Sequence, residues 1–300
     1  MSAPLRVAAF VAGLAALFGV AAGAGYAVGP LDAEPEEEHA MGEAEHGGEE
    51  AGHGGGHEES AEPASHLPGG LMVSQDGYTF ALDATTFAAG RQPVGFTITG
   101  PDGAPVTAYD EEHDKDLHLI GVRRDFAGYQ HVHPVLDAAG RWSTELDLDP
   151  GQWRLFADFT PTGGESLTLG VDVAVPGGYE PAPTPAPSRT ARIAGYEVTL
   201  EGDLVPGEES ELTLRVTRDG EPVTDLQPYL AAYGHLVALR EGDLAYLHVH
   251  PDGEPGDGVT PSGPAVTFLT EVPSAARYRL FFDFKHAGRV HTASFPVAAS

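Results

Sequence analysis

Residues 153–159 read WRLFADF and residues 278–284 read YRLFFDF, and these two related stretches decide the fold. Each has the length and the apolar, aromatic content of a buried β-strand. Six further short runs accompany the first stretch, separated by Gly, Pro or Asp clusters: residues 78–82, 94–99, 117–123, 129–134, 141–148 and 167–175. Seven strands in about 110 residues are typical of a β-sandwich.

The same pattern returns in the second half of the chain. The segment YQHVHP (residues 129–134) recurs 117 residues later as YLHVHP (residues 246–251). Between the two copies, residues 177–189 carry alternate prolines, which favour an extended linker. The sequence therefore predicts an all-β chain with two tandem immunoglobulin-like β-sandwiches, at residues 67–176 and 190–300.

Two different segments precede the predicted sandwiches. Residues 1–30 contain an uncharged run long enough to cross a membrane, so we expect a single-pass membrane helix with the bulk of the chain outside the cytoplasm. A cleaved signal peptide followed by secretion is the alternative. Residues 31–66 are rich in Glu, Gly and His and lack Lys and Arg, which predicts a disordered tether. Five histidines make this tether either a loose metal-collecting arm or a solvated spacer: His39, His46, His53, His57 and His66.

Composition excludes several functional classes. The 16 Lys and Arg stand against 45 Asp and Glu, and the resulting net charge of -29 repels nucleic acids. With no Cys, the chain has no disulfide, iron–sulfur cluster or thiol nucleophile, so a metal site must use His, carboxylate or backbone oxygen. No GxSxG, HExxH or P-loop motif is present, so we do not expect an enzyme. A zinc-dependent hydrolase is the remote exception.

Six histidines form the predicted metal site, three in each copy. Residues two apart in a strand point to one face, so both histidines of an HVH segment can reach one ion. A third histidine lies 13 residues upstream, across a predicted hairpin that sets it opposite the pair. The six are His118, His131 and His133 in the first copy and His235, His248 and His250 in the second. Three imidazoles with an open fourth position suit Cu²⁺ or Zn²⁺.

These histidines also have a structural interpretation. A one-residue change in hairpin register would move His118 to the opposite face, and His118 already shares its face with apolar residues. The imidazoles would then hydrogen-bond the backbone or two aspartates at matching places in the repeat, Asp158 and Asp283. We expect these aspartates to pair with Arg154 and Arg279, and metal ligation is the alternative.

The second copy resembles a known family. From YGHLVAL (residues 233–239) through YLHVHP to YRLFFDFKH (residues 278–286), it is similar to exported bacterial heavy-metal-binding immunoglobulin-like domains related to the YtkA-like and CopC-like copper proteins. The first copy resembles them more loosely. The resemblance implies a β-sandwich outside the cytoplasm that handles copper or another heavy metal, with the six histidines as motif positions. The chain departs from the copper-protein pattern in having three Met and no Met-rich loop, which disfavours Cu⁺.

Together these features predict a membrane-anchored, extracytoplasmic protein that binds a divalent metal ion, copper before zinc, for storage, delivery or sensing. The expected partners are the metal ion and a membrane metal transporter or another exported protein. The alternative function is a metal-independent adhesion or scaffolding module whose histidines are structural.

Overall fold

The computed structural model describes residues 67–247 and 249–300, and the regular elements in these ranges are β-strands. The all-β prediction is confirmed. Contacts within the chain place Pro63–Ser300 in one compact unit. None of the described residues forms a helix long and apolar enough to cross a membrane. The predicted membrane helix and tether lie outside the described residues.

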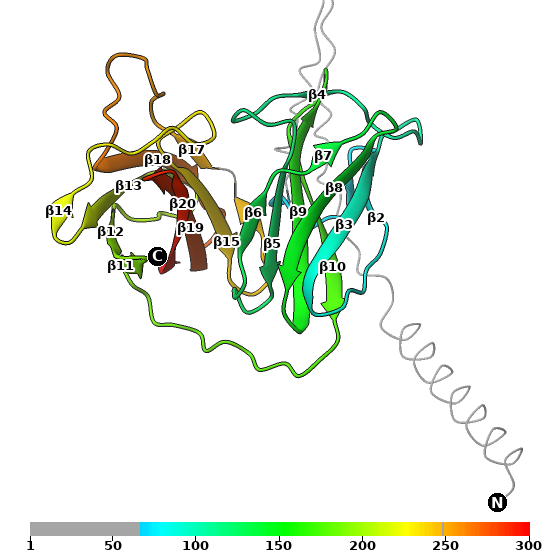
Figure 1. Ribbon diagram of the computed structural model, residues 1–300, viewed down its shortest axis with the longest axis horizontal. Helices are drawn as coiled ribbons and strands as arrows, with labels where there is room; N and C mark the ends of the chain where they lie inside the picture. Colours follow the sequence, from blue (N-terminus) through cyan, green and yellow to red (C-terminus); the bar gives the residue numbers. More distant parts are fainter. Residues whose placement is uncertain (1–66, 248) are drawn as a thin grey trace, which may run out of the picture. The chain divides into compact units, whose positions relative to one another are not determined.

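The first half forms a pair of antiparallel sheets (Figure 1). Its ten strands are β1 (Ser74–Gln75), β2 (Tyr78–Leu82), β3 (Gly90–Thr99), β4 (Tyr109–Asp110), β5 (His118–Arg123), β6 (Gln130–Val132), β7 (Val135–Leu136), β8 (Arg141–Leu148), β9 (Gly151–Pro161) and β10 (Leu167–Val175). One sheet has the order β1-β2-β3-β8-β7 and the other the order β10-β9-β5-β6, with β4 pairing with β9. We call this pair sandwich 1.

The second half repeats this arrangement as sandwich 2. Its strands are β11 (Thr190–Ile193), β12 (Tyr196–Glu201), β13 (Glu209–Arg218), β14 (Glu221–Pro222), β15 (His235–Arg240), β16 (Tyr246–Leu247), β17 (Val249–Pro251), β18 (Ala265–Glu271), β19 (Ala276–His286) and β20 (Arg289–Ala299). One sheet has the order β11-β12-β13-β18-β17, with β14 on β13, and the other the order β16-β15-β19-β20. Strands β5, β6 and β9 thus correspond to β15, β16 and β19.

Each sandwich has its own hydrophobic core, because its strands alternate apolar and polar residues. In β8, Trp142, Leu146 and Leu148 are buried and the residues between them are largely exposed. The large side chains of the first core include Phe80, Phe96, Trp142, Trp153 and Phe159, and those of the second include Phe268, Tyr278, Phe282, Phe284 and Phe295.

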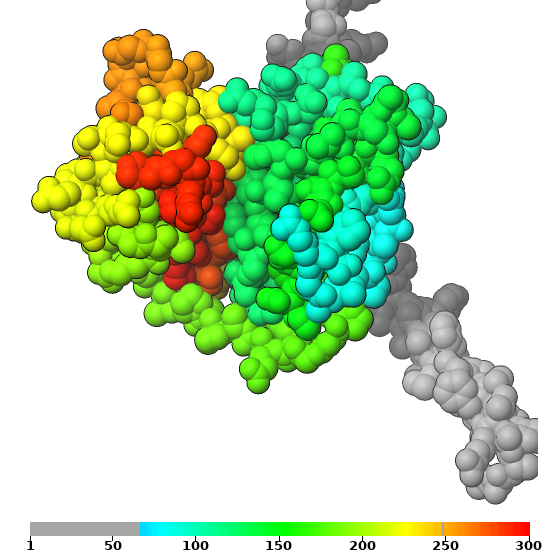
Figure 2. Space-filling view, viewed as in Figure 1, coloured from blue at the N-terminus to red at the C-terminus, as the bar shows by residue number. Residues whose placement is uncertain are grey.

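Four central strands, β5, β9, β15 and β19, do not alternate, and they are buried on both faces. Their second faces form a third hydrophobic cluster that draws residues from both sandwiches: Ile120, Val122, Phe156, Val237, Leu239, Leu244, Tyr246 and Phe281. The two sandwiches therefore pack against each other through these sheets, and their surfaces meet along a continuous seam in Figure 2. We call this contact the interdomain interface.

One predicted strand divides into two. Residues 129–134 were expected to form a single strand, but β6 pairs with β5 in one sheet whereas β7 pairs with β8 in the other. The chain crosses between the sheets at His133 and Pro134, where proline cannot donate a ladder hydrogen bond. In sandwich 2, β16 and β17 likewise belong to different sheets, with residue 248 between them.

The linker runs from residue 176 to residue 189 without regular secondary structure. Hydrogen bonds hold it at both ends: the Ala182 amide donates to Asp125 in sandwich 1, and the Ser188 amide donates to the carbonyl of Pro296 in sandwich 2.

Candidate metal centre

The β5–β6 hairpin brings the three histidines of sandwich 1 together. Its register sets Ile120 opposite His131 and Leu119 opposite Val132. His118 lies two residues before Ile120, and His133 lies two residues after His131, so all three imidazoles share one face. This face is the one that enters the interdomain interface.

The ring nitrogens of this triad converge. His118 Nδ1 lies 3.0 Å from His131 Nε2, and the ligand atoms of His118, His131 and His133 all lie within 4.8 Å of one another. His118 is 3% exposed and the side chain of His131 is 2% exposed, whereas His133 is half-buried.

Sandwich 2 adds His235 and Asp283 to the same cluster. His235 begins β15, and its ring centroid lies 4.6 Å from that of His131 and 5.6 Å from that of His118. Asp283 of β19 is the register partner of His235, and it accepts a 2.9 Å hydrogen bond from His131 Nδ1. The ligand atoms of His131, His235 and Asp283 also lie within 4.8 Å of one another. The cluster is therefore built from both sandwiches.

Hydrogen bonds fix which nitrogens carry protons. His118 Nε2 lies 3.0 Å from the carbonyl of Glu112, which can only accept, so Nε2 carries a hydrogen. His131 Nδ1 donates to Asp283 in the same way. A neutral imidazole has one N–H, so His118 Nδ1 and His131 Nε2 face each other across 3.0 Å as two lone pairs. Two lone pairs at this distance require a cation between them, either an added proton or a metal ion.

Two further nitrogens in the cluster are buried without a hydrogen-bond partner among the described residues, His133 Nε2 and His235 Nδ1. Buried polar atoms are almost always paired, because an unpaired one costs about 1–3 kcal/mol. A metal ion held by imidazoles would satisfy both nitrogens together with the facing lone pairs.

Electrostatics keep these imidazoles neutral. Burial is the main cause that lowers the pKa of His118 to about 4 and that of His133 to about 3, and the neighbouring His131 is the second cause. Burial likewise holds the pKa of His235 well below its ordinary value. At neutral pH these three rings have free lone pairs, which is the form that binds metals.

Of the two histidines in the second HVH segment, only His250 belongs to the part of the chain that the structure describes. His248 lies outside the described residues. His250 is exposed on β17, where it lines a surface pocket with His113. Of the six predicted ligands, the structure thus brings together His118, His131, His133 and His235 and places His250 apart from them.

Neither aspartate forms the expected ion pair with the arginine on its own strand. Arg154 pairs with Asp172, while Asp158 accepts hydrogen bonds from Thr168 and from Tyr246 of sandwich 2. The reason is that Asp158 and Asp283 point into the interdomain interface, where polar groups of the opposite sandwich reach them.

The corresponding pair in sandwich 2 differs in the same way. Arg279 pairs with Glu241, while Asp283 accepts from Thr292 and from His131. Each aspartate therefore binds one residue of its own sandwich and one of the other.

A family model describes both halves of this chain. The model for a domain of unknown function, DUF8832, matches residues 73–177 and again residues 191–300. The chain belongs to this family. No curated protein matches it. The resemblance to copper-related exported domains stays a prediction.

Similar solved structures include two bacterial adhesins. InvE of Yersinia pseudotuberculosis is 12% identical, with 75% of this chain and 59% of that chain covered and a TM-score of 0.22. FdeC of Escherichia coli is 18% identical, with 78% and 67% covered and a TM-score of 0.23. The chain thus spans about three fifths of the InvE chain.

Both DUF8832 domains contribute described residues to the cluster. The first domain supplies three imidazoles, and the second supplies His235 and Asp283. Sequence reasoning treated each copy as a separate site and missed their convergence. The available signal was the run HLIGV at residues 118–122, because a strand without alternation is buried on both faces.

Proposed function

We propose that this protein binds one divalent transition-metal ion between two immunoglobulin-like sandwiches, with His118, His131, His133 and His235 as ligands. We expect copper in preference to zinc as the bound ion. The observation that supports this best is the 3.0 Å contact between His118 Nδ1 and His131 Nε2, whose other nitrogens are already committed as donors. Storage, delivery to a membrane transporter or another exported protein, or sensing would follow, outside the cytoplasm.

The donor set suits such an ion. Metal–nitrogen bonds of about 2.0–2.1 Å in a tetrahedral site place two nitrogens about 3.3 Å apart, near the observed spacing. The Glu112 carbonyl and the Asp283 carboxylate hold the outer nitrogens of His118 and His131, as hydrogen-bonding groups around metal-bound imidazoles commonly do. Four imidazoles favour Cu²⁺ in the order of divalent-ion affinities, while a tetrahedral arrangement favours Zn²⁺.

A metal-independent adhesion or scaffolding module is the second candidate. It is favoured by the hydrogen-bond chain from Glu112 through His118 and His131 to Asp283, which links the two sandwiches without any ion. One added proton on His131 would complete that chain, and the imidazolium would then pair with Asp283. In that case the cluster would only stabilise the interdomain interface.

Calorimetric titration of residues 63–300 with Cu²⁺ and Zn²⁺ separates the two candidates. This segment is one compact unit with all three hydrophobic clusters, and it lacks most of the histidines of the tether. We expect one ion per chain with a dissociation constant below about 1 µM. The informative variant is His133→Ala, because His133 Nε2 has no hydrogen-bond partner among the described residues and its loss should affect metal binding above all.

The matched control is the double variant H286Q/H291Q, which removes two imidazoles of β19 and β20 whose rings lie against Tyr196 of sandwich 2. Strong binding that His133→Ala weakens and the control retains supports the metal site. Equally weak binding by all three proteins would reject it and leave the scaffolding module.

A further inference from the structure

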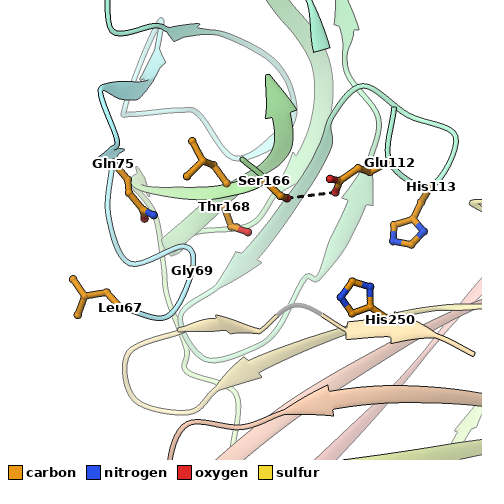
Figure 3. Close-up of a pocket in the computed structure, with 9 residues that line it drawn as sticks. Leu67, Gly69, Gln75, Glu112, His113, Ser166, Thr168 and His250 are labelled. Atoms are coloured by element: carbon orange, nitrogen blue, oxygen red, sulfur yellow. Dashed lines mark hydrogen bonds between the residues drawn. The ribbon is translucent and has the colours of Figure 1, made fainter. Parts of the chain in front are cut away.

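A buried metal site needs a route from solvent. His118 and His235 are 3% and 6% exposed, so an ion in bulk water cannot reach them directly. Beside the cluster lies an open pocket of about 600 Å³, lined among others by Leu67, Glu112, His113, Thr168 and His250. Figure 3 shows the imidazoles of His113 and His250 turned toward each other on one side of this pocket.

His113 connects the pocket to the buried cluster. Its ring centroid lies 5.6 Å from that of His235 and 6.1 Å from that of His118. Imidazoles therefore follow one another at short intervals from the pocket into the interdomain interface. Glu112 lines the pocket, and its backbone carbonyl accepts the hydrogen bond that orients His118. The pocket wall and the cluster therefore share this residue.

The same two histidines, His113 and His250, also line a second pocket. A smaller adjoining pocket is lined by His113 and His250 together with Glu254 and Asp257, which lie in the loop after β17. Carboxylates near an imidazole pair attract cations and raise their local concentration. The route thus begins at acidic side chains, continues through two partly exposed imidazoles and ends at four buried ones.

We propose that His113 and His250 form an access site, which first captures a divalent transition-metal ion and passes it to the buried cluster. This proposal rests on the proposed function and adds a kinetic role for two residues that are not among the final ligands. Ligand exchange moves the ion: a nitrogen of His113 is released as one of His118 or His235 binds. No electron is transferred, and one metal–nitrogen bond forms for each one that breaks.

Stopped-flow loading of residues 63–300 with Co²⁺ tests the access site, because tetrahedral Co²⁺ has intense visible absorption that reports occupancy of the buried cluster. The variant H113A/H250A should load about tenfold more slowly or worse, with unchanged final absorption and unchanged equilibrium affinity. The control H286Q/H291Q removes the same number of imidazoles and should load at the wild-type rate.

Each other result has a definite meaning. Wild-type loading by H113A/H250A would overturn the access site and leave the metal cluster intact. A large loss of affinity or an altered final spectrum would also overturn it, because the two residues would then be ligands. Failure of the wild-type protein itself to bind Co²⁺, Cu²⁺ and Zn²⁺ would overturn the proposed function, and the access site with it.

Discussion

Asp283 and Asp158 occupy matching places in β19 and β9, yet they have different partners across the interdomain interface. Asp283 accepts from His131, and Asp158 accepts from Tyr246. Asp283 therefore acts directly on a proposed ligand, because its hydrogen bond fixes the tautomer that leaves His131 Nε2 free for a metal. The repeat thus supplies two buried aspartates that face the interdomain interface, Asp283 at 1% and Asp158 at 7% exposure.

The difference in partners predicts the effect of one substitution on metal affinity. Asp283→Asn keeps the shape of the side chain and removes the charge that holds His131, so Cu²⁺ and Zn²⁺ should bind about 10- to 100-fold more weakly. The comparison variant is Asp158→Asn, which should weaken binding less, because Asp158 acts on the proposed ligand His118 through its charge rather than through a hydrogen bond. Calorimetric titration measures both, and equal losses would contradict a specific role for the Asp283 hydrogen bond.

The lowered pKa values predict how stability depends on pH. An unfolded imidazole has a pKa of about 6.5, whereas that of His118 is about 4 and that of His133 about 3 in the folded protein. Between these values the unfolded chain binds more protons, so the free energy of unfolding of the metal-free protein should fall as pH decreases from about 6.5 toward 4. Urea unfolding at a series of pH values, with a chelator present, would measure this free energy. In His133→Gln the free energy of unfolding should depend less steeply on pH. A pH profile parallel to that of the wild-type protein would contradict the lowered pKa of His133.

At the scale of elements, the interdomain interface contains an aromatic pair formed by a residue just before β6 and a residue in the middle of β19. Tyr129 precedes β6 and stacks on Phe281 of β19, with ring centroids 3.9 Å apart and planes 8° apart. Tyr246 and Phe156, their counterparts in the repeat, are 5.6 Å apart. Two aromatic pairs related by the repeat therefore flank the cluster.

A double-mutant cycle tests the first of these pairs. Tyr129→Leu and Phe281→Leu each remove one ring and retain apolar bulk. We expect a coupling free energy of about 0.5–1.5 kcal/mol from urea unfolding, because offset aromatic stacking contributes that much beyond buried area. The pair Tyr78 and Phe159, at 6.4 Å within sandwich 1, provides a positive control. Additive effects at Tyr129 and Phe281 would mean that the sandwiches do not stack there in solution.

The sequence located most of the strands and offered two hairpin registers for His118, of which the structure has the one that sets it beside His131. Alternation in residues 141–148 locates β8, and the 13-residue spacing from His118 to His131 places both on one face, as the pairing of β5 with β6 does. Two features were not accessible. His113 lies in a loop with no periodic pattern, so nothing marks it. The crossing at Pro134 divides a continuous strand pattern between two sheets, and this depends on tertiary packing.

At the scale of the whole molecule, the cluster joins two domains that have separate cores. Sandwich 1 supplies three of the four proposed ligands, and sandwich 2 supplies His235. An ion bound by all four stabilises the packed arrangement over any state in which the sandwiches separate, because separation removes a ligand. Metal binding and domain packing are therefore thermodynamically coupled, each favouring the other to the same extent.

This coupling predicts different thermal behaviour for two ligand variants. A metal at about 100 times its dissociation constant should stabilise the wild-type protein by about 2.7 kcal/mol and make both sandwiches unfold in one calorimetric transition at a higher temperature, which a chelator should reverse. His235→Ala retains the three ligands of sandwich 1, so added metal should raise only the unfolding temperature of that sandwich. His118→Ala also retains three ligands, but His235 is among them, so its smaller shift should still affect both sandwiches together. If His235→Ala retained the single, fully shifted transition, the ion would be held by sandwich 1 alone, and the cluster would not couple the two domains.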